Sequence, residues 1–153
     1  MDCNFFDSSA LVKRYTSEIG SSWVESLLDP SAGNLIYIAG IAPVEVVSAI
    51  TRRQRGGSFS LTDAQSAITH FRSFIKTSCR IVPIDDVLIL QAMDLAEEYA
   101  LRGYDAVQLA AVLEVHNERL AFDLSAPTLI SSDLALNEAA IAEGLSVDDP
   151  NLH

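Results

Sequence analysis

Short runs of apolar, β-branched and aromatic residues alternate along this chain with longer segments whose apolar residues have helical spacing. Strands that alternate with helices in this way are typical of a parallel sheet covered by helices. The pattern therefore predicts the α/β class, with a central parallel sheet flanked by helices on both faces. We expect the strands within residues 3–6, 35–40, 80–84, 128–131 and 145–147.

Two helices in the second half of the chain have clear end signals. Asp85 or Asp86 caps a long helix, and Gly103 is well placed to stop it. The next helix starts at Tyr104 and is apolar on most of its faces. We therefore expect this helix to lie at the centre of the fold.

The length of the chain fits one domain that spans residues 1–153, and 49% hydrophobic residues supply one core. Charged residues soon after the first apolar run argue against a secretory signal, and no apolar run is long enough for a membrane span. Cys3 and Cys79 are far apart and lack metal-site spacing. Reduced thiols fit a cytoplasmic protein.

The charge is strongly acidic and unevenly distributed. A net charge of −11 argues against a protein that coats nucleic acid without regard to sequence. Residues 1–80 carry eight of the ten Lys and Arg, whereas residues 81–153 carry fourteen of the 21 Asp and Glu. A polyanion would therefore have to approach the N-terminal half, and the C-terminal half is solvated or meets a basic partner.

Four acidic residues mark points where an apolar run gives way to a helical pattern: Asp7, Glu45, Asp105 and Asp133. Ligands bind at the carboxyl ends of strands in α/β sheets. Carboxylates gathered there repel each other, at roughly 3 kcal/mol per pair for a separation of ~5 Å and an effective dielectric of about 20. Oxygen ligands of this kind suit Mg²⁺ or Mn²⁺.

Helix capping is the alternative explanation for each of these acids, because Asp is a favoured N-cap and acidic residues suit first turns. Two features set the four apart. Asp7 and Asp133 directly follow apolar strands, and Glu45 and Asp105 begin the two helices that look most buried. A buried charge is costly unless it is paired or bound to metal.

Few basic residues are available for contacts with an RNA backbone. The best candidates are Lys13, Arg14, Arg52, Arg53 and Arg55. Solvated helix ends with favourable dipole interactions remain the alternative, and so does docking of an acidic partner segment.

The motifs around the four acids resemble those of a known family. FFDSSALVKRY, PVEVVSAI, GYDAVQLAAV and ISSDLALNEAA are similar, in this order, to the acidic motifs of PIN-domain ribonucleases, especially VapC-like toxins of VapBC toxin–antitoxin pairs. The resemblance extends from Asp2 to about Val147. Ser131 stands where the family often has Thr, and the segment NERLAFDLSAP is longer than expected, which extends the preceding helix or alters the dimer surface.

The resemblance implies both a site and an activity. Asp7, Glu45, Asp105 and Asp133 would hold Mg²⁺ or Mn²⁺, with support from Ser9 and from Ser131 or Ser132. The implied function is a Mg²⁺-dependent endoribonuclease, the toxin component of a type II toxin–antitoxin system. Its partners would be an RNA substrate, a cognate antitoxin protein and a second copy in a homodimer.

Two other classes of protein compete with the nuclease. A phosphoacceptor receiver module needs a Lys on a late strand, and residues 81–153 contain no Lys. A catalytically silent PIN-fold interaction protein stays open, and metal binding without RNA cleavage would distinguish it.

Overall fold

A five-stranded sheet forms the centre of the molecule in the computed structural model, which describes residues 1–153. All four strand pairings are parallel, in the order β3-β2-β1-β4-β5. This confirms the predicted α/β class with a parallel sheet. The strands are β1 (Cys3–Phe6), β2 (Leu35–Ala39), β3 (Arg80–Val82), β4 (Thr128–Ile130) and β5 (Ser146–Asp148).

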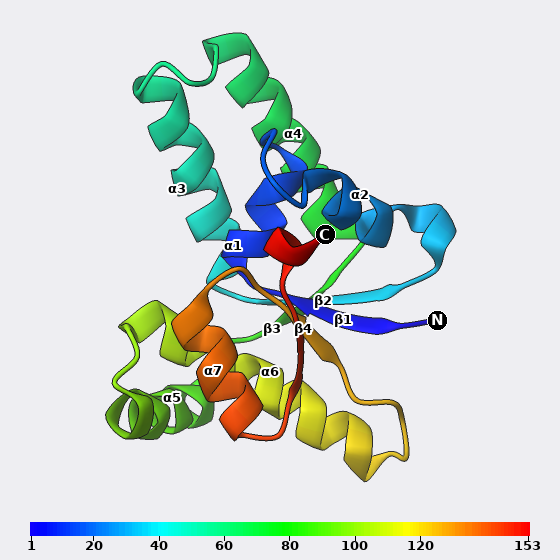
Figure 1. The fold of residues 1–153 in the computed structure, drawn as a ribbon, viewed down its shortest axis with the longest axis vertical. Coiled ribbons are helices and arrows are strands. Elements are labelled where there is room, and N and C mark those ends of the chain that lie inside the picture. The colour runs from blue at the N-terminus through cyan, green and yellow to red at the C-terminus, as the bar shows by residue number, and fades with distance from the viewer.

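Seven α-helices cover the two faces of the sheet, as Figure 1 shows. The first four lie on one face: α1 (Ser8–Leu11), α2 (Ser21–Leu28), α3 (Ala42–Arg55) and α4 (Leu61–Thr77). The last three lie on the other face: α5 (Asp86–Tyr99), α6 (Gly103–Ala121) and α7 (Leu134–Ala142). Short 3₁₀ helices occupy Val12–Arg14, Pro30–Ala32 and Pro150–Leu152.

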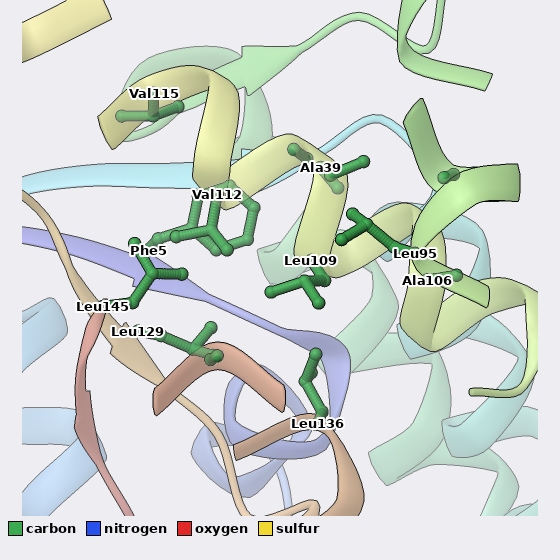
Figure 2. Close-up of a cluster of buried hydrophobic side chains, with 14 of the residues drawn as sticks. Phe5, Ala39, Leu95, Ala106, Leu109, Val112, Val115, Leu129, Leu136 and Leu145 are labelled. Carbon is green, nitrogen blue, oxygen red and sulfur yellow. The ribbon is translucent and has the colours of Figure 1, made fainter. Parts of the chain in front are cut away.

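Each face of the sheet has its own hydrophobic core, because neighbouring residues of a strand point to opposite faces. Phe5 on β1 is fully buried in the core beneath α5, α6 and α7, and Figure 2 shows it with Leu109 and Leu129. Phe6, its neighbour, is fully buried among α1, α3 and α4, together with Phe71. The two phenylalanines thus fix the central strand from both sides.

Helices α3 and α4 form a hairpin that extends beyond the sheet (Figure 1). Its turn contains Gly57, whose φ of 86° lies in the left-handed region that favours glycine. None of the helices is both long and apolar enough to cross a membrane.

The prediction that Gly103 stops the long helix was wrong. Helix α5 ends at Tyr99, where Ala100 takes the left-handed conformation with a φ of 53°, and Gly103 is the first residue of α6. Helix α6 is central, as predicted, and it continues through Ala121. Its early start puts Asp105 inside the first turn of α6.

Candidate functional site

Asp7 lies at the carboxyl end of the central strand and caps α1. One carboxylate oxygen accepts hydrogen bonds from the Ala10 N–H (3.0 Å) and the Ser9 hydroxyl (2.7 Å). The other accepts a hydrogen bond from the hydroxyl of Ser131 (2.9 Å). Only 3% of Asp7 is exposed, so its carboxylate is held in one orientation.

The charge of Asp7 is poorly compensated. Burial raises the pKa of its carboxyl to about 7, and the charge of Asp133 adds to the rise, although the hydrogen bonds of Ser9, Ala10 and Ser131 oppose it. No Lys or Arg contributes to the pKa of Asp7. A cation beside this carboxylate would relieve the cost of burying its charge.

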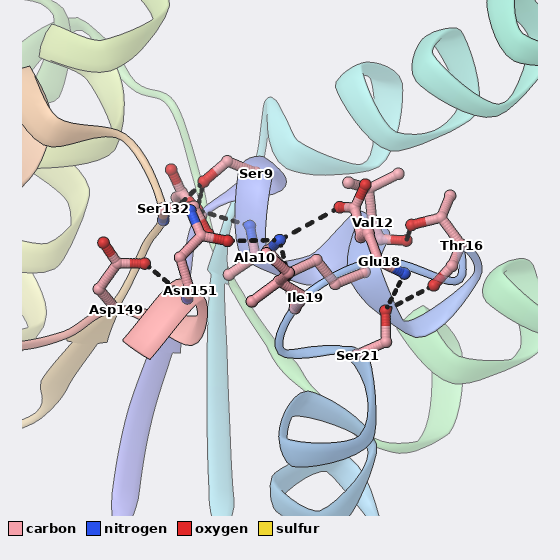
Figure 3. Close-up of polar contacts among 12 residues, drawn as sticks. Ser9, Ala10, Val12, Thr16, Glu18, Ile19, Ser21, Ser132, Asp149 and Asn151 are labelled. Carbon is pink, nitrogen blue, oxygen red and sulfur yellow. Dashed lines mark hydrogen bonds and ion pairs between the residues drawn. The ribbon is translucent and has the colours of Figure 1, made fainter. Parts of the chain in front are cut away.

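Asp133 follows β4 and caps α7, where one of its oxygens accepts a hydrogen bond from the Leu136 N–H (2.9 Å). The Asp133 N–H donates to the Ser131 hydroxyl (3.1 Å), so Ser131 connects Asp7 with Asp133. The Ser132 N–H donates to the Ser9 hydroxyl (3.0 Å), as seen in Figure 3. These bonds tie the segment after β1 to the segment after β4.

Asp105 is not a helix cap, since Arg102 holds the N-cap position of α6. Asp105 is 5% exposed as a residue, and no hydrogen bond contributes to the pKa of its carboxyl. Burial raises the pKa of Asp105 to about 6, the charges of Asp133 and Glu45 add to the rise, and the charge of Arg102 opposes it. Asp105 is therefore not an N-cap, although its place in the first turn of α6 still suits the helix dipole, whereas Asp7 and Asp133 are N-caps as well as candidate ligands.

Glu45 lies in the first turn of α3 and is half-buried. Its carboxylate accepts a hydrogen bond from the side-chain amide of Gln108 (3.1 Å). Gln108 is 1% exposed and lies one turn beyond Asp105 on α6. This bond brings the start of α3 to the side of α6 that carries Asp105.

The structure thus arranges the four acids as a series of neighbours. The charge of Asp133 raises the pKa of both Asp7 and Asp105, and the charge of Glu45 raises that of Asp105. As the side chains stand, no three His, Cys, Asp or Glu residues are grouped closely enough to hold one metal ion together. The oxygen donors and the two under-compensated carboxylates nevertheless fit Mg²⁺, which usually takes one or two carboxylates and keeps several waters.

The ammonium of Lys13 is bound by groups of the protein itself. Lys13 is 5% exposed, and its ammonium donates to the Ile19 carbonyl (2.8 Å) and the Asn151 side chain (2.9 Å). It also pairs with Glu18 at 3.3 Å. Figure 3 labels these three partners, Ile19, Asn151 and Glu18. The ammonium is therefore committed inside the protein, and we remove Lys13 from the RNA-contact candidates.

The arginines among the candidates have different surroundings. Arg14 lies over the ring of Phe74, 5.2 Å from its centroid. Arg53 pairs with Glu18 at 3.4 Å. Arg52 and Arg55 are exposed and take part in no ion pair. The last two are the arginines most available for a phosphate.

Sequence reasoning missed three polar residues close to the acids. Gln108 holds Glu45, and its spacing of three residues from Asp105 puts both on one helix face, which is a signal that could have identified it. Asn137 donates to the Ser131 carbonyl (2.8 Å) and thereby fixes the segment after β4. Tyr104 directly precedes Asp105, and its hydroxyl accepts a hydrogen bond from Arg102 (3.0 Å).

Comparison with known proteins agrees with this architecture. The sequence matches the PIN domain family over residues 5–141. It is 33% identical over 111 residues to Ribonuclease VapC45 of Mycobacterium tuberculosis (strain CDC 1551 / Oshkosh), which covers 72% of this chain and 75% of that protein.

Solved structures share the fold at lower sequence identity. PAE2754 from Pyrobaculum aerophilum has a TM-score of 0.63 at 18% identity, covering 99% of this chain and 91% of that one. VapBC2 from Rickettsia felis, bound to a DNA fragment from its promoter, has a TM-score of 0.59 at 14% identity, covering 96% and 98%. Since the family match spans most of the sheet and its helices, the chain belongs to the PIN-domain family and is VapC-like within it.

Proposed function

We propose that this protein is a Mg²⁺- or Mn²⁺-dependent endoribonuclease and the toxin of a type II toxin–antitoxin pair. The observation that carries the proposal is the arrangement of four acidic side chains from separate segments at one edge of the sheet. Two of them, Asp7 and Asp105, are buried with raised pKa values. The similarity to Ribonuclease VapC45 supports RNA as the substrate.

The four acids have different tasks in the proposed site. Asp7, Asp105 and Asp133 would hold the cation, with Glu45 as a further ligand, directly or through water. When bound, a divalent cation supplies a hydroxide nucleophile near neutral pH and offsets charge on the phosphate. Ser9 and Ser131 keep the Asp7 carboxylate in place, and Gln108 does the same for Glu45.

Few exposed basic residues are available to contact the phosphates of RNA. Arg52 and Arg55 are exposed and unpaired, so we propose them as the main backbone contacts, with Arg14 and Arg53 as secondary ones. With so few cations, the metal ion itself would provide much of the attraction for the scissile phosphate.

We also propose a cognate antitoxin partner, because a toxin of this kind must be held inactive in the cell that makes it. The structural similarity to VapBC2 supports this part of the proposal. A homodimer and a cytoplasmic location complete it. The dimer rests on the family resemblance and the location on the free thiols of Cys3 and Cys79. Sedimentation analysis of the purified chain tests the dimer.

The experiment that tests the function uses Asp105→Asn. Purified wild type and variant are compared on the same single-stranded RNA with Mg²⁺ or Mn²⁺, beside their thermal melts. Because Asp105 is not an N-cap and accepts no stabilising hydrogen bond, the variant should be at least as stable as wild type. Its rate of RNA cleavage should fall by a factor of about 100 or more, because the cation loses an anionic ligand.

Two outcomes would contradict the proposal. Equal cleavage by both proteins would show that Asp105 is not part of the catalytic site. Metal binding by the wild type without cleavage of any RNA would instead identify a catalytically silent PIN-fold interaction protein.

A further inference from the structure

We infer that a groove beside the four acids, lined by Tyr104, Arg52, Ser8 and Ser48, binds one unpaired nucleotide next to the scissile phosphate, with its base stacked on Tyr104. This inference rests on the proposed nuclease function. The groove would recognise the base at one defined position of a single-stranded RNA segment.

The groove has a volume of about 490 Å³ and lies where α1, α3 and the start of α6 meet. Glu45 and Ser9 belong to its lining, and Ser9 donates a hydrogen bond to Asp7. The groove therefore opens directly beside the acidic site. A strand whose phosphate reached the four acids would have a neighbouring nucleotide in this groove.

Along the groove, helix α3 presents an acidic, then a neutral polar, then a basic side chain. Glu45, Ser48 and Arg52 all line it, and their spacing of three and four residues puts them on one face of the helix. The separation of seven positions between Glu45 and Arg52 corresponds to about 10 Å along the helix axis. The acidic end suits a metal ion, and the exposed, unpaired Arg52 at the other end suits a second phosphate.

Tyr104 faces this helix from the first turn of α6 and directly precedes Asp105. It remains 42% exposed, and the guanidinium of Arg102 holds its hydroxyl at 3.0 Å. An exposed aromatic ring fixed at its polar end is a platform on which a base can stack. The hydroxyls of Ser8 and Ser48 are suited to the 2′-hydroxyl or base edge of the same nucleotide.

The charge of the protein favours a short unpaired segment over a duplex. A duplex presents many phosphates and needs many cations, whereas the net charge here is −11 and the groove contains one arginine. Stacking and hydroxyl contacts need little positive charge. An unpaired nucleotide is therefore the ligand that fits this lining.

The test compares Tyr104→Leu with Tyr104→Phe, which differ in the aromatic face but are similar in size. The wild-type cut is first mapped on a single-stranded oligoribonucleotide, and abasic residues are then placed one at a time around it. We expect Tyr104→Leu to raise KM about tenfold or more, as for loss of one stacked base, and Tyr104→Phe to stay within about threefold of wild type. An abasic residue at one position should slow the wild type by a similar factor and leave Tyr104→Leu unaffected.

Arg52 is tested by salt dependence. Arg52→Ala should flatten the slope of log KM against log salt by about one unit, whereas Lys76→Ala, which removes an exposed, unpaired charge from α4 outside the groove, should not change it. Thermal melts confirm that each variant is folded.

The possible results separate this inference from the proposed function. If wild type cleaves RNA and Tyr104→Leu cleaves it equally well, the proposed nucleotide subsite is refuted and the nuclease function is retained. If substitutions in the groove then weaken only the binding of a protein partner, the groove is that partner's binding site. If wild type cleaves no RNA, the proposed nuclease function is refuted. The nucleotide subsite is then tested separately, by measuring the affinity of wild type and Tyr104→Leu for the labelled oligoribonucleotide with fluorescence anisotropy. Equal affinity of wild type and Tyr104→Leu would overturn it.

Discussion

Replacing Asp7 by Asn should make the metal-free protein more stable at pH 8, although Asp7 is the most fully hydrogen-bonded acid of the site. Its pKa rises from 3.8 to about 7, and each pKa unit corresponds to about 1.4 kcal/mol. The ionised carboxylate thus costs roughly 4 kcal/mol of folding free energy above pH 7. Asn keeps the N-cap hydrogen bond, and the hydroxyl of Ser131 loses its acceptor at a cost of about 1 kcal/mol.

The net gain is therefore about 3 kcal/mol, or roughly 6–12 °C in melting temperature for a domain of this size. The pH dependence has a definite sign. Because the folded-state pKa is raised, the folded protein binds more protons than the unfolded chain between pH 4 and 7. Metal-free wild type should lose stability as pH rises through this window, and Asp7→Asn should lose much less.

Urea unfolding in EDTA at pH 5, 6, 7 and 8 measures both quantities. Asp63→Asn is the matched control, because Asp63 is an exposed acidic residue in the first turn of α4. If the free energy of unfolding of wild type and Asp7→Asn changed in parallel with pH, or if the variant were less stable at pH 8, the buried charge of Asp7 would not be destabilising.

Three further predictions concern the neighbours of the site. Saturating Mg²⁺ or Mn²⁺ should raise the melting temperature of wild type by several degrees and that of Asp7→Asn little, and equal shifts in calorimetry would refute a role for Asp7 in binding. Gln108→Leu should lower RNA cleavage about tenfold with little loss of stability, because only Glu45 loses its donor; unchanged cleavage would make Gln108 a packing residue. Lys13→Met should cost about 3 kcal/mol in urea unfolding and leave cleavage per folded molecule unchanged, and a cleavage defect would return Lys13 to the RNA contacts.

The fold was predictable because its signals are local. Apolar runs such as Cys3–Phe6 and the helical patterns between them define strands and helices without knowledge of their partners. The end of α5 was not predictable, since Ala100 adopts a left-handed conformation for which alanine has no preference, and the glycine three residues later starts α6 instead. Tertiary packing determines whether α5 is stopped at Ala100 or at Gly103.

The site shows a similar division. The positions of Asp7 and Asp133 follow from the strands before them. The burial of Lys13 depends on Asn151, at the other end of the chain, and no local pattern predicts that contact. The bond between Gln108 and Glu45 also joins distant segments, α3 and α6, and becomes visible only once both helices are packed.

We propose that the four acids bind a divalent cation at the carboxyl edge of the sheet. The most direct measurement is an anomalous difference map from a crystal soaked in Mn²⁺. We expect a peak within about 2.5 Å of the carboxylates of Asp7 or Asp105, with Asp133 and Glu45 contacting it directly or through water. A peak elsewhere on the molecule, or no peak beside these residues at a saturating Mn²⁺ concentration, would contradict it.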